Sequence, residues 1–121
     1  MARIPNREVS AAVSERMNFS THNETLHAVS HTDGGYLVTT YNVPLAYWCP
    51  VSSQWYVNKF RYSRTTSRHL GHTLSGIAIK REPYTMVPEN HLHKLVNQGY
   101  VRYVATLMAD SARPDDAKEL D

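Results

Sequence analysis

Apolar residues recur along the chain at two different spacings, and each spacing predicts a type of element. Val9, Ala12, Val13 and Met17 follow one another at intervals of one, three or four residues, as on one face of an α-helix. Apart from Ala11, the residues between them are polar or charged. The first predicted element is therefore an amphipathic helix over residues 5–17.

Further along, the pattern changes to short runs of β-branched and aromatic residues separated by turn residues. Such runs are typical of β-strands, and the short connections make neighbouring strands antiparallel. Asp33-Gly-Gly35 is the clearest hairpin turn. The region from residue 19 to 62 is therefore predicted to be a β-meander with strands at 25–31, 36–41, 45–49 and 54–62.

A helical period returns after the meander. Leu70, Leu74 and Ile77 form one apolar stripe, which predicts a helix over residues 65–80. Another helix is predicted over 88–98, where Gly99 is a typical residue for the C-terminal cap.

The last residues are less distinct. Residues 100–108 fit either a strand or a helix, and we favour a fifth strand. Five acids, two bases and a proline in residues 110–121 predict a disordered acidic tail. The fold class expected is α+β: a four- to five-stranded antiparallel β-meander packed by two or three helices. It divides into an N-terminal helix (1–18), one α+β domain (19–109) and the tail.

The net charge of +2 conceals an uneven distribution. Residues 34–81 contain no Asp or Glu, although charged residues make up 20% of the chain. This acid-free block predicts a positive surface on the middle of the domain. Its six cations are Lys59, Arg61, Arg64, Arg68, Lys80 and Arg81.

Two features bear on the compartment. No run approaches the roughly 20 apolar residues that span a bilayer, and the first residues lack the apolar run of a secretory signal. Cys49 is the single cysteine, so no internal disulfide forms, as is typical of a reducing compartment. We expect a cytoplasmic protein without a membrane partner.

The best candidate site is the basic tract at residues 62–72, where a strand leads into a helix. Free N–H groups at a helix start attract phosphate, and hydroxyl and guanidinium groups add donors. By strand alternation Trp55 shares a face with Lys59 and Arg61, so a base could stack there. The alternative is an ordinary helix cap. The expected partner-binding residues are Trp55, Lys59, Arg61, Arg64, Thr65, Thr66, Ser67, Arg68, His69 and His72.

Catalytic chemistry has weaker support. His69 and His72 are three residues apart on the predicted helix, and His91 and His93 form a second pair, but no acid joins them in a metal-binding pattern. Cys49 alternates with apolar residues, which predicts a buried, inert thiol. There is no glycine-rich phosphate loop. No catalytic residue, metal ligand or cofactor is assigned, and an enzyme is the less favoured class.

Three motifs carry a resemblance to a known group. They are Val43-Pro-Leu-Ala-Tyr47, Trp55-Tyr-Val57 and Tyr62-Ser-Arg-Thr-Thr-Ser-Arg-His69. With them, residues 19–79 resemble a group of small uncharacterised proteins encoded by bacteriophages. The resemblance implies a phage gene acting in the host cytoplasm, and it implies no particular activity.

The leading expectation is a small phage accessory protein that binds a host or viral macromolecule, either protein or nucleic acid, without catalysis. One alternative is a nucleic-acid or nucleotide-binding module that uses the basic segment 59–81. A second alternative is a metal-dependent hydrolase that uses its histidines. The open edges of the predicted sheet also allow a homodimer.

Overall fold

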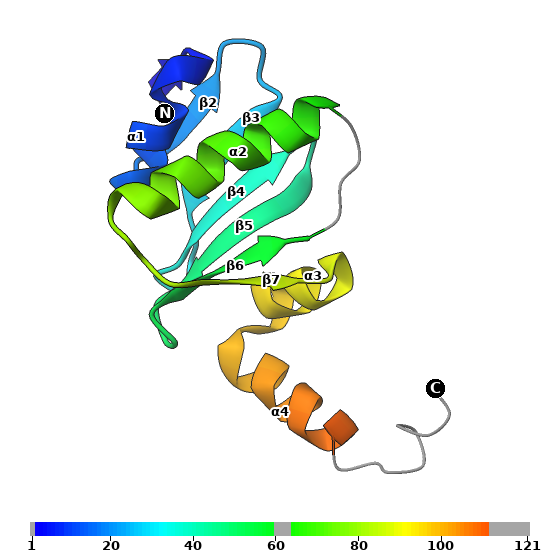
Figure 1. Ribbon diagram of the computed structural model, residues 1–121. Helices are drawn as coiled ribbons and strands as arrows, with labels where there is room; N and C mark the ends of the chain where they lie inside the picture. The colour runs from blue at the N-terminus through cyan, green and yellow to red at the C-terminus, as the bar shows by residue number, and fades with distance from the viewer. Residues whose placement is uncertain (1, 60–63, 112–121) are drawn as a thin grey trace.

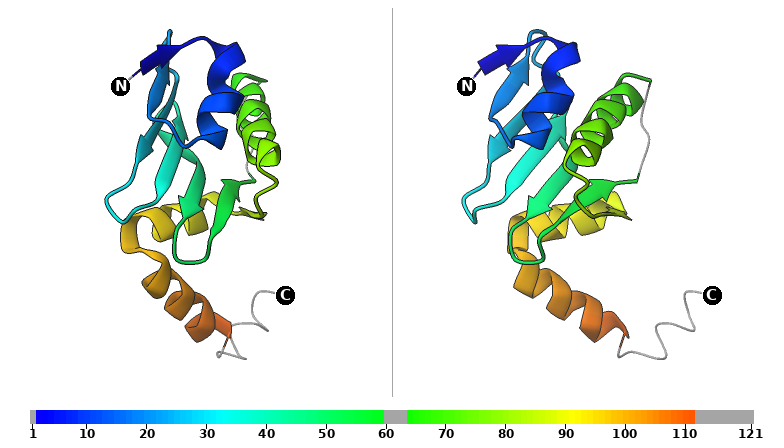
Figure 2. Two further views of the ribbon diagram at one scale, coloured as in Figure 1. Left: turned by 90° about the vertical axis from the view of Figure 1, so that its left-hand side faces the viewer. Right: turned by 60° about the vertical axis from the view of Figure 1, so that its left-hand side comes forward.

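The computed structural model describes residues 2–59 and 64–111. These residues form one mixed sheet of seven strands with helices on both faces (Figure 1). Helices α1 and α2 cover one face, and α3 and α4 lie on the other (Figure 2). In chain order the elements are β1 (Ala2–Ile4), the 3-10 turn η1 (Asn6–Glu8), α1 (Val9–Ser14), β2 (Phe19–Thr21), β3 (Leu26–Ser30), β4 (Tyr36–Thr40), β5 (Val43–Cys49), β6 (Gln54–Asn58), α2 (Arg64–Ile79), β7 (Tyr84–Val87), α3 (Glu89–Gln98) and α4 (Tyr100–Ser111).

The strands lie in the sheet in the order in which they occur in the chain. Strands β2 to β6 form an antiparallel meander, whereas β1 is parallel to β2 and β7 is parallel to β6. Parallel neighbours require a crossover connection. Helix α1 supplies it at one edge of the sheet and α2 supplies it at the other, so both helices are part of the topology.

The four predicted strands of the meander are confirmed as β3 to β6, but the expected sheet was too small. Strands β1, β2 and β7 are only three or four residues long, too short to show an alternating pattern. The prediction of four or five antiparallel strands is corrected to seven strands in a mixed sheet. The predicted strand 54–62 ends at Asn58, and residues 60–63 lie outside the described residues.

The helices at residues 65–80 and 88–98 are confirmed as α2 and α3, and Gly99 ends α3 with φ 88°. The fifth strand expected over residues 100–108 is wrong, because these residues belong to α4. Tyr100, Tyr103 and Leu107 pack against the sheet at helical spacing. The tail expected at 110–121 begins inside α4, and residues 112–121 are outside the described part of the chain.

The N-terminal helix is shorter than predicted, and it belongs to the core. Val9 and Val13 are fully buried, while Met17, expected on the same face, is 50% exposed. The first core lies between α1, α2 and the sheet, and Trp55 at its centre is the largest fully buried side chain. A second core lies between the opposite face of the sheet and α3 with α4.

Helices α1 and α2 approach each other closely at Gly76. A Cβ atom at this position would lie 2.7 Å from the Ser10 carbonyl oxygen and 2.8 Å from Val13 Cβ. The Ser10 hydroxyl also donates to the carbonyl of His72 over 2.9 Å. Only a residue without a side chain allows this approach, which explains a glycine inside a long helix.

An arginine stack closes the same end of the first core. The Arg16 guanidinium lies 3.9 Å from the centre of the Trp48 ring and forms an ion pair with Glu82. The Trp55 indole N–H donates to the other oxygen of that carboxylate over 3.2 Å. The turn after α1 is thereby attached to the turn after α2.

The two glycines of α2 offer a matched test of the contact. Gly76→Ala is expected to lower the free energy of unfolding by about 1–3 kcal/mol, because the added methyl meets backbone and Val13. Gly71→Ala meets no atom within 4 Å, and it is expected to raise stability by up to about 1 kcal/mol through helix propensity. Urea denaturation measures both, and equal stabilities for the two variants would contradict the close approach.

Candidate functional site

The basic tract is the start of helix α2, and the helix separates its residues onto two faces. Thr66 and His69 face the sheet and are 4% and 2% exposed, whereas Ser67 and Arg68 face solvent. His72 is half-buried. Arg64 and Thr65 belong to the first turn of α2, and the predicted site residue Arg61 lies outside the described residues.

The buried half of the tract forms a polar contact with strand β4. The Thr40 hydroxyl and His69 Nδ1 are 2.8 Å apart, and the Thr73 hydroxyl donates to the His69 carbonyl over 2.9 Å. Burial lowers the pKa of His69, and the nearby positive charges of His72 and Arg68 lower it further. The imidazole is therefore neutral at pH 7 and acts as a packed, hydrogen-bonded core residue.

One exposed aromatic residue lies beside the start of α2, and the sequence did not single it out. Tyr41 is 53% exposed, and its ring lies 6.2 Å from that of His69 at an angle of 28°. It occupies the turn between β4 and β5, where Tyr41 and Asn42 have φ values of 48° and 65°. A bulky residue is disfavoured in this left-handed region. Strained backbone positions of this kind are frequent at functional sites, which makes the exposed ring of Tyr41 a candidate binding residue.

Trp55 cannot serve as the stacking surface expected of it. Its side chain is fully buried, it makes edge contacts with Tyr36 and Trp48, and its N–H is bonded to Glu82. Lys59 lies just beyond the end of β6 and is exposed, with its backbone N–H donated to the Val87 carbonyl over 3.0 Å. Trp55 and Lys59 therefore do not share a solvent-facing surface.

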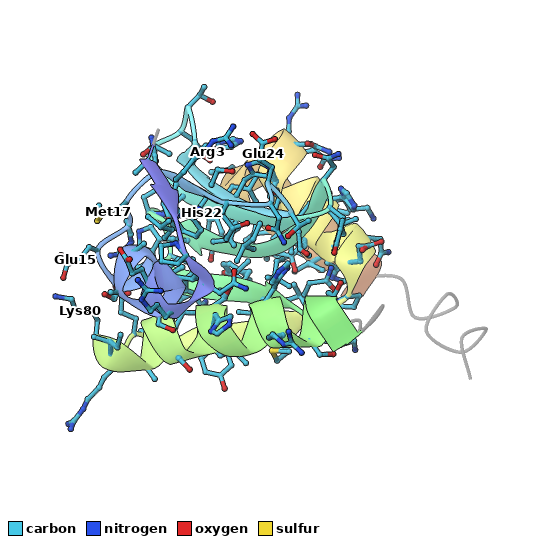
Figure 3. All side chains as sticks on the ribbon, turned by 90° about the horizontal axis from the view of Figure 1, so that it is seen from above. Arg3, Glu15, Met17, His22, Glu24 and Lys80 are labelled. Carbon is cyan, nitrogen blue, oxygen red and sulfur yellow. The ribbon has the colours of Figure 1, made fainter. Side chains whose placement is uncertain are left out.

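The cations of the acid-free block differ in their partners. Lys80 lies 3.0 Å from Glu15, and these two side chains lie close together in Figure 3. Arg3, outside the block, is paired with Glu24 at the top of that view. Within the described residues, Lys59 and Arg68 form no ion pair, so their charges face solvent without neutralisation.

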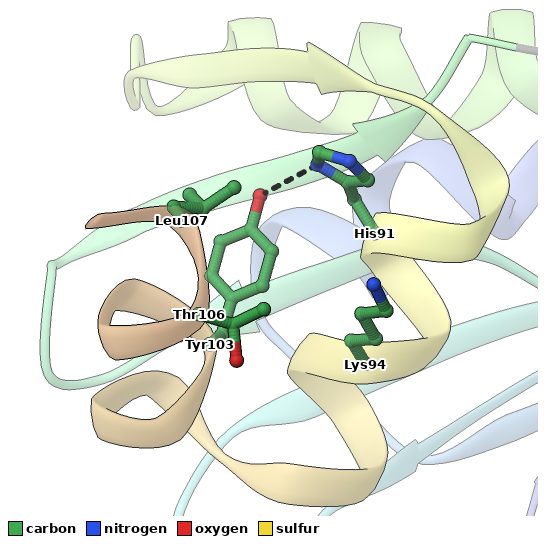
Figure 4. Close-up of a pocket in the computed structure, with 5 residues that line it drawn as sticks. All are labelled: His91, Lys94, Tyr103, Thr106 and Leu107. Atoms are coloured by element: carbon green, nitrogen blue, oxygen red, sulfur yellow. Dashed lines mark hydrogen bonds between the residues drawn. The ribbon is translucent and has the colours of Figure 1, made fainter. Parts of the chain in front are cut away.

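The histidines do not gather into a metal site in the described part of the chain, where no group of three or more His, Cys, Asp or Glu could hold an ion. Instead, Nδ1 of His91 lies 3.4 Å from the Tyr103 hydroxyl oxygen, in a small pocket between α3 and α4 (Figure 4). The pocket has a volume of about 10 Å³, space for about one water molecule. Cys49 is confirmed as buried.

A second polar cluster, which the sequence analysis missed, locks the β3–β4 hairpin. Asp33 accepts hydrogen bonds from the Tyr47 hydroxyl and, over 2.8 Å, from the Gly35 N–H, and His31 Nδ1 lies 3.0 Å from it. Burial tends to raise the pKa of Asp33, but these three contacts outweigh it and lower the pKa. The sequence shows the turn motif at Asp33, but it does not show the contact with Tyr47, which depends on the register of β5 in the sheet.

Comparison of the chain with protein-family models, with curated proteins and with solved structures finds no match. Among the described residues, none of the helices has both the length and the apolar character that crossing a bilayer requires.

The buried His69 predicts a pH dependence of stability. The unfolded chain takes up a proton near pH 6.5 whereas the folded His69 resists it, so folding stability decreases as the pH falls from about 6.5 through the lowered pKa. His69→Gln removes this titration and is expected to flatten the dependence between about pH 7 and 5. Urea denaturation at several pH values measures it, and unchanged slopes in the variant would contradict the assignment.

Proposed function

We propose that this protein is a small, non-enzymatic phage accessory protein that binds a host or viral macromolecule in the host cytoplasm. The proposed contact is the α2 start surface, defined as Tyr41, Lys59, Arg68 and His72. The phage origin rests on the resemblance of residues 19–79. The binding role rests on the charge of the surface.

The observation that carries the proposal is the presence of two exposed cations, Lys59 and Arg68, in a stretch of sequence that contains no Asp or Glu. Lys59 and Arg68 face solvent, and neither forms an ion pair among the described residues. Four residues separate Lys59 from Arg64 at the start of α2, which keeps both at one end of the sheet. An uncompensated positive surface favours an anionic partner and speeds its association.

The polar residues behind this surface support a rigid platform more than a reactive centre. Thr40 holds Nδ1 of His69, and the residue is only 2% exposed, so the other ring nitrogen has little access to a metal ion or a substrate. A histidine-based hydrolase therefore has less support than binding.

Charge reversal tests the binding role. Lys59→Glu with Arg68→Glu is expected to abolish capture of the partner from a bacterial lysate at low salt, because the surface changes from positive to negative. The matched control is Arg7→Glu with Arg102→Glu, which makes the same change of charge at two exposed arginines on other elements. If both double variants capture the same partner as the wild type, the α2 start surface is not the contact.

A second candidate function, binding of single-stranded nucleic acid, is favoured by Tyr41. An exposed aromatic ring beside the start of α2 would allow a base to stack while its phosphates meet Arg68 and Lys59. Such binding depends steeply on salt, because each phosphate contact releases counterions. A partner of this kind would disappear from the lysate capture after nuclease treatment, whereas an acidic protein would remain.

Removal of the ring tests this candidate directly. Tyr41→Ala is expected to weaken binding of a labelled single-stranded oligonucleotide by about 1–3 kcal/mol, the typical value of one stacking interaction. Tyr41→Phe should retain binding, and Tyr84→Ala, which removes a tyrosine that is 50% exposed on β7, is the control. Fluorescence anisotropy at low salt measures affinity, and equal affinities for both alanine variants would exclude stacking on Tyr41.

A further inference from the structure

An open groove lies between strand β1 and helix α1. Its volume is about 180 Å³, and the residues that line it are Ile4, Glu8, Ala11, Ala12, Glu15 and Met17. Four of these six residues are exposed, so solvent has free access to the groove. Pockets for drug-sized ligands usually measure roughly 300–1,000 Å³, so this groove takes a smaller group.

The floor and the walls of the groove are apolar. Ala12 is 5% exposed, and Ile4 packs against the first core. Ala11 is small and exposed, and it leaves space that a longer side chain at this position would fill. Met17 is 50% exposed, and its unbranched, flexible side chain adapts to different contacts. The lining therefore suits an apolar chain.

Acidic residues at the groove determine what the end of that chain carries. Glu8 and Glu15 lie three residues before and four residues after Ala11, at the spacing of neighbours on a helical surface. Lys80 lies 3.0 Å from Glu15, and Figure 3 shows both near Met17 on one side of the molecule. Glu8 forms no ion pair among the described residues. An apolar chain that ends in a cation is therefore complementary to the groove.

We propose that the groove binds a basic side chain, Lys or Arg, that a partner protein presents. These side chains bury their alkyl stems on apolar surface and keep the charged end accessible to an acid such as Glu8. A free small ligand is usually buried over most of its surface, whereas this groove is open, so the rest of a larger partner has to cover it.

This contact is independent of the proposed function. Lys80 follows the last turn of α2, so the groove is beside the end of that helix, whereas the α2 start surface is at its beginning. The two surfaces also select opposite charges. Loss of binding at one surface therefore leaves the other untested and intact.

Three capped amino acids test whether both the stem and the charge are recognised. N-acetyl-norleucine methylamide has the stem of N-acetyl-lysine methylamide without the ammonium group, and N-acetyl-glutamate methylamide carries the opposite charge. The lysine probe is expected to bind up to about fivefold more tightly than the norleucine probe, the range of one exposed ion pair. The glutamate probe should bind most weakly. The net charge of +2 disfavours a cation, so a preference for lysine reports the local acids.

NMR of the methionine methyl groups measures each titration on the full chain. The Met17 signal should move, while Met86, which packs against the first core, is the internal control. Equal affinities for the lysine and norleucine probes overturn the proposal, because the groove would then recognise only an apolar chain. A Met17 signal that does not move with the lysine probe overturns it as well.

Two pairs of variants locate the binding. Glu8→Gln should remove most of the preference for lysine and leave norleucine binding unchanged, whereas Glu24→Gln, at a carboxylate that pairs with Arg3, should keep the preference. Ala11→Phe fills the groove and should abolish binding of all three probes, while Ala105→Phe on α4 should not. A lysine preference that survives Glu8→Gln contradicts the assignment of the cation to this acid.

Discussion

The close packing of α1 on α2 is the contact on which the rest of the structure depends. Each helix is the crossover that brings a parallel strand to one edge of the sheet, and the two meet where Gly76 lies against Ser10 and Val13. Arg16 and Glu82 then join the turns that follow the two helices. A five-strand antiparallel meander thereby becomes a seven-strand sheet with a closed first core.

The same packing gives the functional tract its two faces. Because α2 lies across the sheet, Thr66, His69 and Thr73 are forced into its contact with the core. A buried imidazole is tolerated because Thr40 satisfies it and because it stays neutral. The residues between these positions, Ser67 and Arg68, must then face solvent. Core and surface roles alternate within one short motif for this geometric reason.

Lys59 and Arg68 are exposed cations that form no ion pair among the described residues, whereas α4 exposes the apolar side chains Val101 and Met108. These two surfaces differ in character, because one is positive and the other is apolar.

The sequence by itself determined the α+β class, the four central strands, the helices α2 and α3, the buried thiol and the acid-free block. These follow from local periodicity and composition, which are properties of a short segment. It did not identify the short edge strands, the helix α4 or the exposure of Tyr41 in place of Trp55. Only the tertiary structure determines these features, because a segment of three residues becomes a strand only when a neighbouring strand forms hydrogen bonds with it. Likewise, whether Trp55 or Tyr41 is buried depends on which elements pack over each side chain.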